Sequence, residues 1–111
     1  MRGQTITSRE NPAVKQYTAL ASSRRRRRED GRFTTEGVKL TLEAFTAGYT
    51  PEARFLTQDL TDSVRRRLMP VAAACRRLYE ISPSVAAKLA GAVSPQGVFG
   101  VFMMLDNRTQ P

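Results

Sequence analysis

Residues 98–105 read VFGVFMML, an almost wholly apolar run near the end of the chain. Such a run is typical of a strand that helices cover on both faces, so we predict a central strand of a sheet here. The run is far shorter than the roughly 18 apolar residues that span a bilayer. The amino terminus also lacks the hydrophobic segment of a signal peptide. We therefore expect a soluble, cytoplasmic protein that does not enter a membrane.

Strand-like and helix-like segments alternate before this run. Asn11-Pro12 and Ser82-Pro83 each place a capping residue before a proline, which indicates the start of a helix. With the apolar spacing that follows, the sequence predicts helices over 12–21, 38–47, from Thr61 or Asp62 onward, and 83–92. Short strands are predicted over 32–35, 53–57 and 79–81. At 111 residues the chain is one domain, and the alternation predicts a small α/β/α sandwich of three layers, with a mixed sheet of about four strands.

Pro70 interrupts the third predicted helix. Val64, Leu68 and Val71 share one apolar face across the proline, so the segment is either one kinked helix or two helices, and we favour a break or kink. The single cysteine, Cys75, cannot form an internal disulfide and is interpreted as a small core filler, in agreement with a reducing compartment.

Five consecutive arginines dominate the charge of the chain: Arg24, Arg25, Arg26, Arg27 and Arg28. They are predicted at the carboxyl end of the first helix or in the connection after it, exposed in either case. The chain carries 18 Lys and Arg against 10 Asp and Glu, and most of the excess lies before residue 40. A concentrated basic field attracts a polyanion, so phosphate groups are the expected ligand. A solvated tract, a localisation signal or a membrane surface are the alternatives, and the membrane ranks last because no large apolar residue interleaves with the arginines.

Several kinds of catalytic and metal site are excluded by composition. The chain has no histidine and one cysteine, which removes Ser-His-Asp triads, zinc sites with histidine ligands and cysteine-rich metal sites. No glycine-rich nucleotide fingerprint occurs. The adjacent carboxylates Glu29 and Asp30 follow the arginines directly, so we interpret them as salt-bridge partners of that run. We predict no catalytic residue and no metal in this chain.

Four motifs in register resemble one family: residues 6–15 (ITSRENPAVK), 28–37 (REDGRFTTEG), 43–48 (EAFTAG) and 94–98 (SPQGV). Together they are similar to the amino-terminal substrate-binding domain of SpoU/TrmH-type RNA ribose methyltransferases. The resemblance implies an L30e-like fold, with residues 1–105 as an RNA-binding domain and residues 106–111 as the start of a linker.

The same resemblance implies that methyl transfer belongs to a following knotted SPOUT domain, which binds S-adenosylmethionine and dimerises. The N-x-G-x-x-x-R motif of that domain does not occur in this sequence. The expected partner is ribosomal or transfer RNA, and this chain alone is expected to bind no cofactor. The alternative is a freestanding RNA-binding protein of the L30e/L7Ae type without enzymatic activity.

The resemblance and the charge pattern together give a set of candidate RNA contacts. Asn11 is interpreted as a helix cap, and Glu36-Gly37 as the turn from a strand into a helix. The pairs Arg66-Arg67 and Arg76-Arg77 are interpreted as solvated helix surface. The candidate contacts are Arg9, Lys15, the five arginines from Arg24 to Arg28, Arg32, Lys39 and Gln96.

Overall fold

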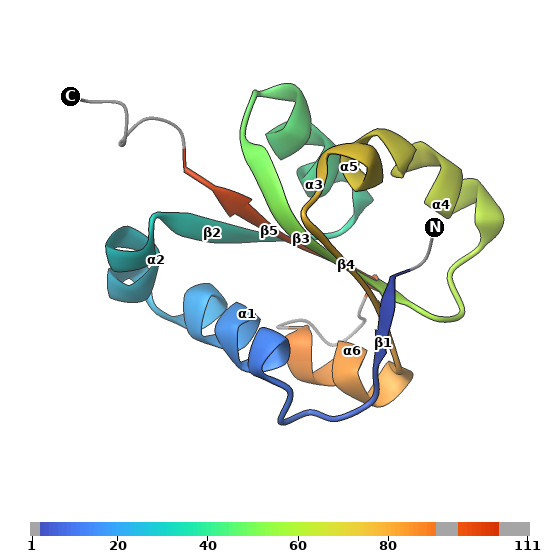
Figure 1. Cartoon of the computed structure of the whole chain (residues 1–111), viewed down its shortest axis with the longest axis horizontal. Helices are drawn as coiled ribbons and strands as arrows, with labels where there is room; N and C mark the ends of the chain where they lie inside the picture. The colour runs from blue at the N-terminus through green and yellow to red at the C-terminus, as the bar shows by residue number, and fades with distance from the viewer. Residues whose placement is uncertain (1–2, 91–95, 105–111) are drawn as a thin grey trace.

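The computed structural model describes residues 3–90 and 96–104. These residues form a five-stranded mixed sheet and six helices (Figure 1). The strands are β1 (Gln4–Ile6), β2 (Arg32–Glu36), β3 (Thr50–Thr57), β4 (Arg77–Ile81) and β5 (Val98–Met103). The helices are α1 (Pro12–Ser22), α2 (Arg24–Asp30), α3 (Val38–Thr46), α4 (Asp62–Arg67), α5 (Met69–Ala74) and α6 (Pro83–Leu89).

The strand order across the sheet is β1-β4-β3-β5-β2. β4 runs parallel to β1 and β3, whereas β5 is antiparallel to both of its neighbours, β3 and β2. The predicted strand of the apolar run is therefore interior, and residues 98–102 are buried. The middle strand is β3 rather than β5. Leu105, the last residue of the predicted strand, lies outside the described residues, as does the predicted linker 106–111.

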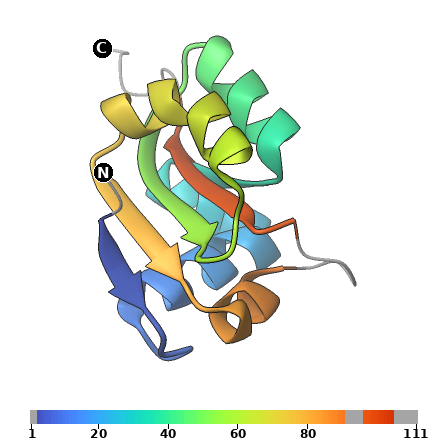
Figure 2. The same ribbon diagram turned by 90° about the vertical axis from the view of Figure 1, so that its right-hand side faces the viewer.

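Helices cover both faces of the sheet, which confirms the three layers (Figure 2). α1 and α6 pack on one face around a core that includes Val14, Phe55 and Phe99, and α3, α4 and α5 cover the other face around Leu56, Leu68 and Val98. The sheet has five strands and not about four. The strand that sequence reasoning missed is β1, whose first two residues are exposed and which buries only Ile6.

The predicted capping signals begin helices where expected. The Oδ1 atom of Asn11 accepts a hydrogen bond from the Ala13 amide at 2.8 Å, which confirms Asn11 as the cap of α1. The hydroxyls of Thr61 and Ser82 cap α4 and α6 in the same way. α6 ends at Leu89 within the described residues. Ala90 is already extended, so the predicted helix to residue 92 is wrong at its end. The predicted turn at 94–95 lies outside the described residues.

Pro70 marks the start of a new helix. α4 ends at Arg67 and α5 begins at Met69, so the break precedes the proline, which occupies the first turn of α5 where its missing N–H is not needed. Cys75 follows α5 and is only half-buried, so it is not a full core residue. Burial raises the pKa of its thiol above the ordinary value.

A buried ion cluster lies between the sheet and the α4–α5 layer. The guanidinium of Arg65 on α4 donates two hydrogen bonds to the carboxylate of Glu80 on β4, at 2.7 and 2.8 Å. The Nη2 atom of Arg54 on β3 lies 3.9 Å from the same carboxylate, and the side chains of Arg54 and Glu80 are each 4% exposed. Arg65 also donates to the carbonyls of Leu60 and Thr57, so it fixes the β3–α4 connection to the sheet.

Candidate nucleic-acid interface

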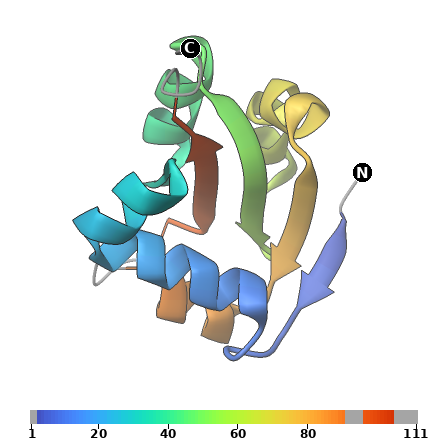
Figure 3. The ribbon, with the colours of Figure 1, turned by 60° about the vertical axis from the view of Figure 1, so that its left-hand side comes forward.

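The five arginines form a helix of their own, α2, and not the end of α1 or a connection as predicted. The Ser23 hydroxyl accepts from the Arg26 amide at 3.1 Å and begins the helix. Gly31, in the left-handed region at φ 67°, ends it by donating its N–H to the Arg27 carbonyl. None of its residues is buried. Figure 3 shows α2 at the carboxyl end of α1, projecting beyond the sheet.

The arginines of α2 fall into three groups that differ in their ion-pair and hydrogen-bond partners. The Nε atoms of Arg25 and Arg26 pair with Glu29 and Asp30 one turn later, at 2.9 and 3.2 Å, which confirms the salt-bridge interpretation of the acidic pair. Arg27 is half-buried, and its Nη1 atom donates to the Leu20 carbonyl at the end of α1. The remaining two, Arg24 and Arg28, are exposed and form no ion pair within the described residues.

Arg32 is held by an ion pair inside the fold. Its Nη2 atom lies 3.0 Å from Glu52 Oε2, its Nε atom contacts Glu52 Oε1, and its Nη1 atom donates to the Asp30 carbonyl at 2.8 Å. The hydrogen bonds to Glu52 raise the pKa of Arg32 above its ordinary value. Three of its five N–H groups are engaged, so Arg32 links the start of β2 to β3 across the intervening β5 and has few donors left for a phosphate.

Lys39 and Gln96 lie at the other end of β2. Gly37 caps α3 with φ 98°, and its N–H donates to the Val98 carbonyl at 2.8 Å, so Glu36-Gly37 is the predicted strand-to-helix turn. A Cβ on Gly37 would lie 2.5 Å from Gln96 Oε1, which shows that the Gln96 side chain rests on this glycine. Lys39 is exposed in the first turn of α3. A five-residue strand is about 16 Å long, so this pair is separate from α2.

Arg9 and Lys15 occupy a third place, at the amino end of α1. Both are exposed, and Lys15 Nζ lies 3.1 Å from Glu10 Oε1. An eleven-residue helix is about 16 Å long, so α1 separates these residues from α2. The structure thus distributes the ten candidate contacts over three regions, and the densest of them is α2.

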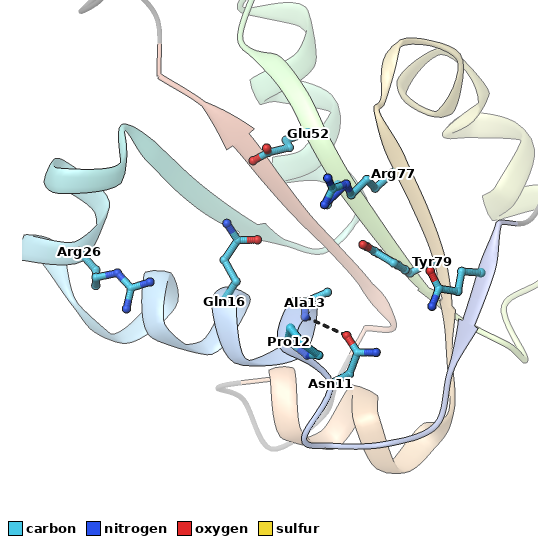
Figure 4. Close-up of a pocket in the computed structure, with 10 residues that line it drawn as sticks. Asn11, Pro12, Ala13, Gln16, Arg26, Glu52, Arg77 and Tyr79 are labelled. Carbon is cyan, nitrogen blue, oxygen red and sulfur yellow. Dashed lines mark hydrogen bonds between the residues drawn. The ribbon is translucent and has the colours of Figure 1, made fainter.

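A polar groove borders α2 on the α1 face of the sheet (Figure 4). It has a volume of about 470 Å³ and lies between α1 and the amino ends of β3 and β4. Figure 4 shows Arg26 at one end, Arg77 on the sheet side, and Gln16 and Glu52 between them. Its other lining residues are Gln4, Asn11, Pro12, Ala13, Ala53 and Tyr79.

Sequence reasoning placed Arg76 and Arg77 on a helix, which is wrong for Arg77. α5 ends at Ala74, and Arg77 instead begins β4, although both arginines are exposed as predicted. In a strand, Arg77, Tyr79 and Ile81 share one face. The predicted strand over 79–81, extended by two residues, would have placed Arg77 on this face.

Two further observations concern membranes and metals. No helix in the described part of the chain is long and apolar enough to cross a membrane. Within residues 3–90 and 96–104, no three His, Cys, Asp or Glu side chains gather in a way that could hold a metal ion.

Residues 11–100 match the family described as the MRM3-like substrate binding domain. Among solved structures, the chain is similar to an RNA 2'-O ribose methyltransferase, with 29% identity and a TM-score of 0.78 over 97% of this chain and 40% of that one. It is also similar to an rRNA methyltransferase from Sinorhizobium meliloti, with 26% identity and a TM-score of 0.74 over 91% of this chain and 37% of that one.

A more distant likeness shows the fold alone. The SpoU methyltransferase AviRb from Streptomyces viridochromogenes is 23% identical, with a TM-score of 0.65 over 85% of this chain and 33% of that one. No curated protein sequence matches the chain. The chain spans less than half the length of each of these solved structures.

Proposed function

The chain belongs to the MRM3-like substrate-binding domain family, and from that premise we propose that it holds the RNA substrate of an RNA 2'-O-ribose methyltransferase. The methyltransferases to which it is similar support this proposal. None of these comparisons supports the alternative of a freestanding RNA-binding protein.

The observation that carries the proposal is α2. A helix normally buries an apolar stripe, but no residue of α2 is buried, and four of its five arginines are exposed. Such a helix adds little to the core, so its composition is explained by what it meets outside the domain. Ser23, Gly31 and the pairs to Glu29 and Asp30 hold the guanidiniums on a fixed backbone. A regular array of this kind suits contacts to RNA phosphates, which position a substrate without reading its sequence.

The proposal assigns methyl transfer to a separate domain that follows a linker beginning near residue 106. That domain would bind S-adenosylmethionine and supply the dimer contact, and the whole protein would act in the cytoplasm. The polar groove does not fit the cofactor. The polar groove carries Arg26 and Arg77, which would repel the cationic sulfonium, and its aromatic residue, Tyr79, is 8% exposed and already stacked on Phe55.

The chain of residues 1–111 is accordingly expected neither to bind S-adenosylmethionine nor to methylate RNA. Isothermal titration calorimetry with the cofactor should give no binding heat, because the polar groove presents two guanidiniums to a cationic ligand. The same sample must bind structured RNA, which serves as the control for folding. Stoichiometric cofactor binding would contradict the assignment of the chemistry to another domain.

Removing the exposed arginines of α2 should weaken RNA binding and its dependence on salt. The variant changes Arg24, Arg25, Arg26 and Arg28 to Gln, which favours helices, and keeps Arg27 because it caps α1. Each lost phosphate contact should flatten the plot of log affinity against log salt by roughly 0.7 to 0.9. A loss of two to four contacts is measurable by fluorescence anisotropy with a structured RNA, whereas the melting temperature should barely change.

The control changes Arg66 and Arg67 to Gln on α4, which covers the opposite face of the sheet. This double variant should keep most of the salt slope. If the α2 variant retains both the slope and the affinity of the parent, α2 is a solvated surface. The RNA must then be sought at the Lys39 and Gln96 end of β2.

A further inference from the structure

The polar groove beside α2 combines the groups that a nucleotide requires. Its volume of about 470 Å³ lies within the range of roughly 300–1,000 Å³ that is usual for small-ligand sites. It is surrounded by two guanidiniums, by residues of the strands β1, β3 and β4, and by the amino end of α1 (Figure 4). It opens directly beside the arginines that the proposed function gives to RNA phosphates.

The two arginines of the groove supply the phosphate ligands. The Nε atom of Arg26 is oriented by Asp30 at 3.2 Å, which leaves both Nη groups to donate. Arg77 is exposed at the start of β4 and has no ion pair within the described residues. A guanidinium binds a phosphate through two parallel charge-assisted hydrogen bonds. Arg26 and Arg77 can therefore hold the two phosphates that flank one nucleotide.

The residues between the arginines supply hydrogen bonds for a base edge. The Gln16 amide offers a donor and an acceptor, and Glu52 offers acceptor oxygens whose charge Arg32 already balances. Asn11 uses its Oδ1 atom on the Ala13 amide, so only its amino group is left to donate. Ala53 and Tyr79 also line the groove, but both are at least nine-tenths buried, so the polar side chains make most of its accessible wall. The edge of a nucleobase presents donors and acceptors that match these side chains.

We infer that the groove receives one unpaired nucleotide of the RNA that α2 holds. Its flanking phosphates lie on Arg26 and Arg77, and its base edge faces Gln16 and Glu52. A base inside a duplex has its pairing edge occupied, so only a loop, bulge or end can enter the groove. The inference rests on the proposed function, because it takes RNA as the ligand. It adds that this domain distinguishes unpaired from paired RNA.

The test compares two neighbouring arginines that differ in whether they line the groove. The variants Arg77→Gln and Arg76→Gln remove the same charge from exposed positions, but only Arg77 lines the groove. A third variant, Gln16→Ala, removes the base contact without changing charge. Affinity is measured by fluorescence anisotropy for a hairpin RNA with an unpaired loop and for a blunt duplex RNA of the same length.

We expect Arg77→Gln to lower hairpin affinity roughly tenfold, the effect of one charge-assisted hydrogen-bonded contact, with little change for the duplex. Arg76→Gln should cause only a small change in affinity, of about the same size for the hairpin and for the duplex. Gln16→Ala should lower hairpin affinity about threefold and leave its salt slope unchanged, because Gln16 is neutral.

The outcomes separate the two proposals. If the parent chain binds neither RNA, the proposed function itself fails. If the parent binds RNA but Arg77→Gln and Arg76→Gln lose affinity equally, the groove contributes only general charge and the inference is overturned. The inference is also overturned if Arg77→Gln loses as much affinity for the duplex as for the hairpin. All three variants should melt like the parent, since none of the three side chains is buried.

Discussion

Replacing Val101 with Asp is expected to unfold the domain. Val101 lies on β5 with no exposed surface, between Thr34 on β2 and Ala53 on β3. A carboxylate there would lose its water without gaining a partner, which costs several kcal/mol even if the group becomes protonated. The total stability of a domain this size is about 5–15 kcal/mol, and a loss above about 4 kcal/mol removes much of it. Circular dichroism should show a transition far below that of the parent, or none.

The matched control places the same charge on the surface. Leu40 is 53% exposed on α3, so Leu40→Asp should melt within a few degrees of the parent. If Val101→Asp melts like Leu40→Asp, then Val101 is not buried, and the position of β5 inside the sheet is wrong.

The layers and most elements could be predicted from the sequence because they depend on local signals. Residues 98–105 are too apolar for any place other than a covered strand, and Asn11-Pro12 and Ser82-Pro83 begin helices by capping chemistry that needs no distant partner. β1 lacked such a signal. Its three residues bury one side chain, and it becomes a strand only because Gln4 and Ile6 lie beside Tyr79 and Ile81 of β4.

α2 was missed for a different reason. Five like charges and no apolar stripe argue against a helix, and the run was interpreted as the end of α1 or a connection. Its stabilising contacts were nevertheless visible in the sequence: Ser23 as a cap, Gly31 as a stop, and acids four residues after Arg25 and Arg26. Glu29 and Asp30 were interpreted as salt-bridge partners of the arginines. Both pairs join residues four apart, which is the spacing of a helix, so that interpretation already pointed to one.

The polar groove could not be predicted, because its walls come from segments that only the sheet order brings together. Gln16 on α1 and Arg77 on β4 are distant in sequence, and they face each other because β4 lies between β1 and β3 while α1 covers that face. Sequence spacing likewise says nothing of which arginines are structural. Arg27, Arg32 and Arg65 look like other basic residues, yet each is engaged by carbonyls or carboxylates inside the fold.

The buried ion cluster gives the second large effect. Glu80→Gln keeps the shape of the side chain but removes the charge that faces Arg65 and Arg54. The guanidinium of Arg54 would remain in a site where its side chain is 4% exposed, without the carboxylate opposite it. Removing one partner of a buried ion pair costs about 3–5 kcal/mol, mostly because the other charge stays desolvated. We therefore expect the melting temperature to fall by roughly 12–20 °C.

Two comparisons show whether this loss comes from the buried charge. Glu43→Gln on α3 makes the same chemical change at an exposed position and should leave the melting temperature within about 2 °C of the parent. Arg65→Lys should fall between the two, because a lysine keeps the charge beside Glu80 but cannot donate in parallel to both carboxylate oxygens and to the Leu60 and Thr57 carbonyls. If the melting temperature of Glu80→Gln equals that of Glu43→Gln, water reaches the cluster. The β3–α4 connection is then held by its backbone and not by Arg65.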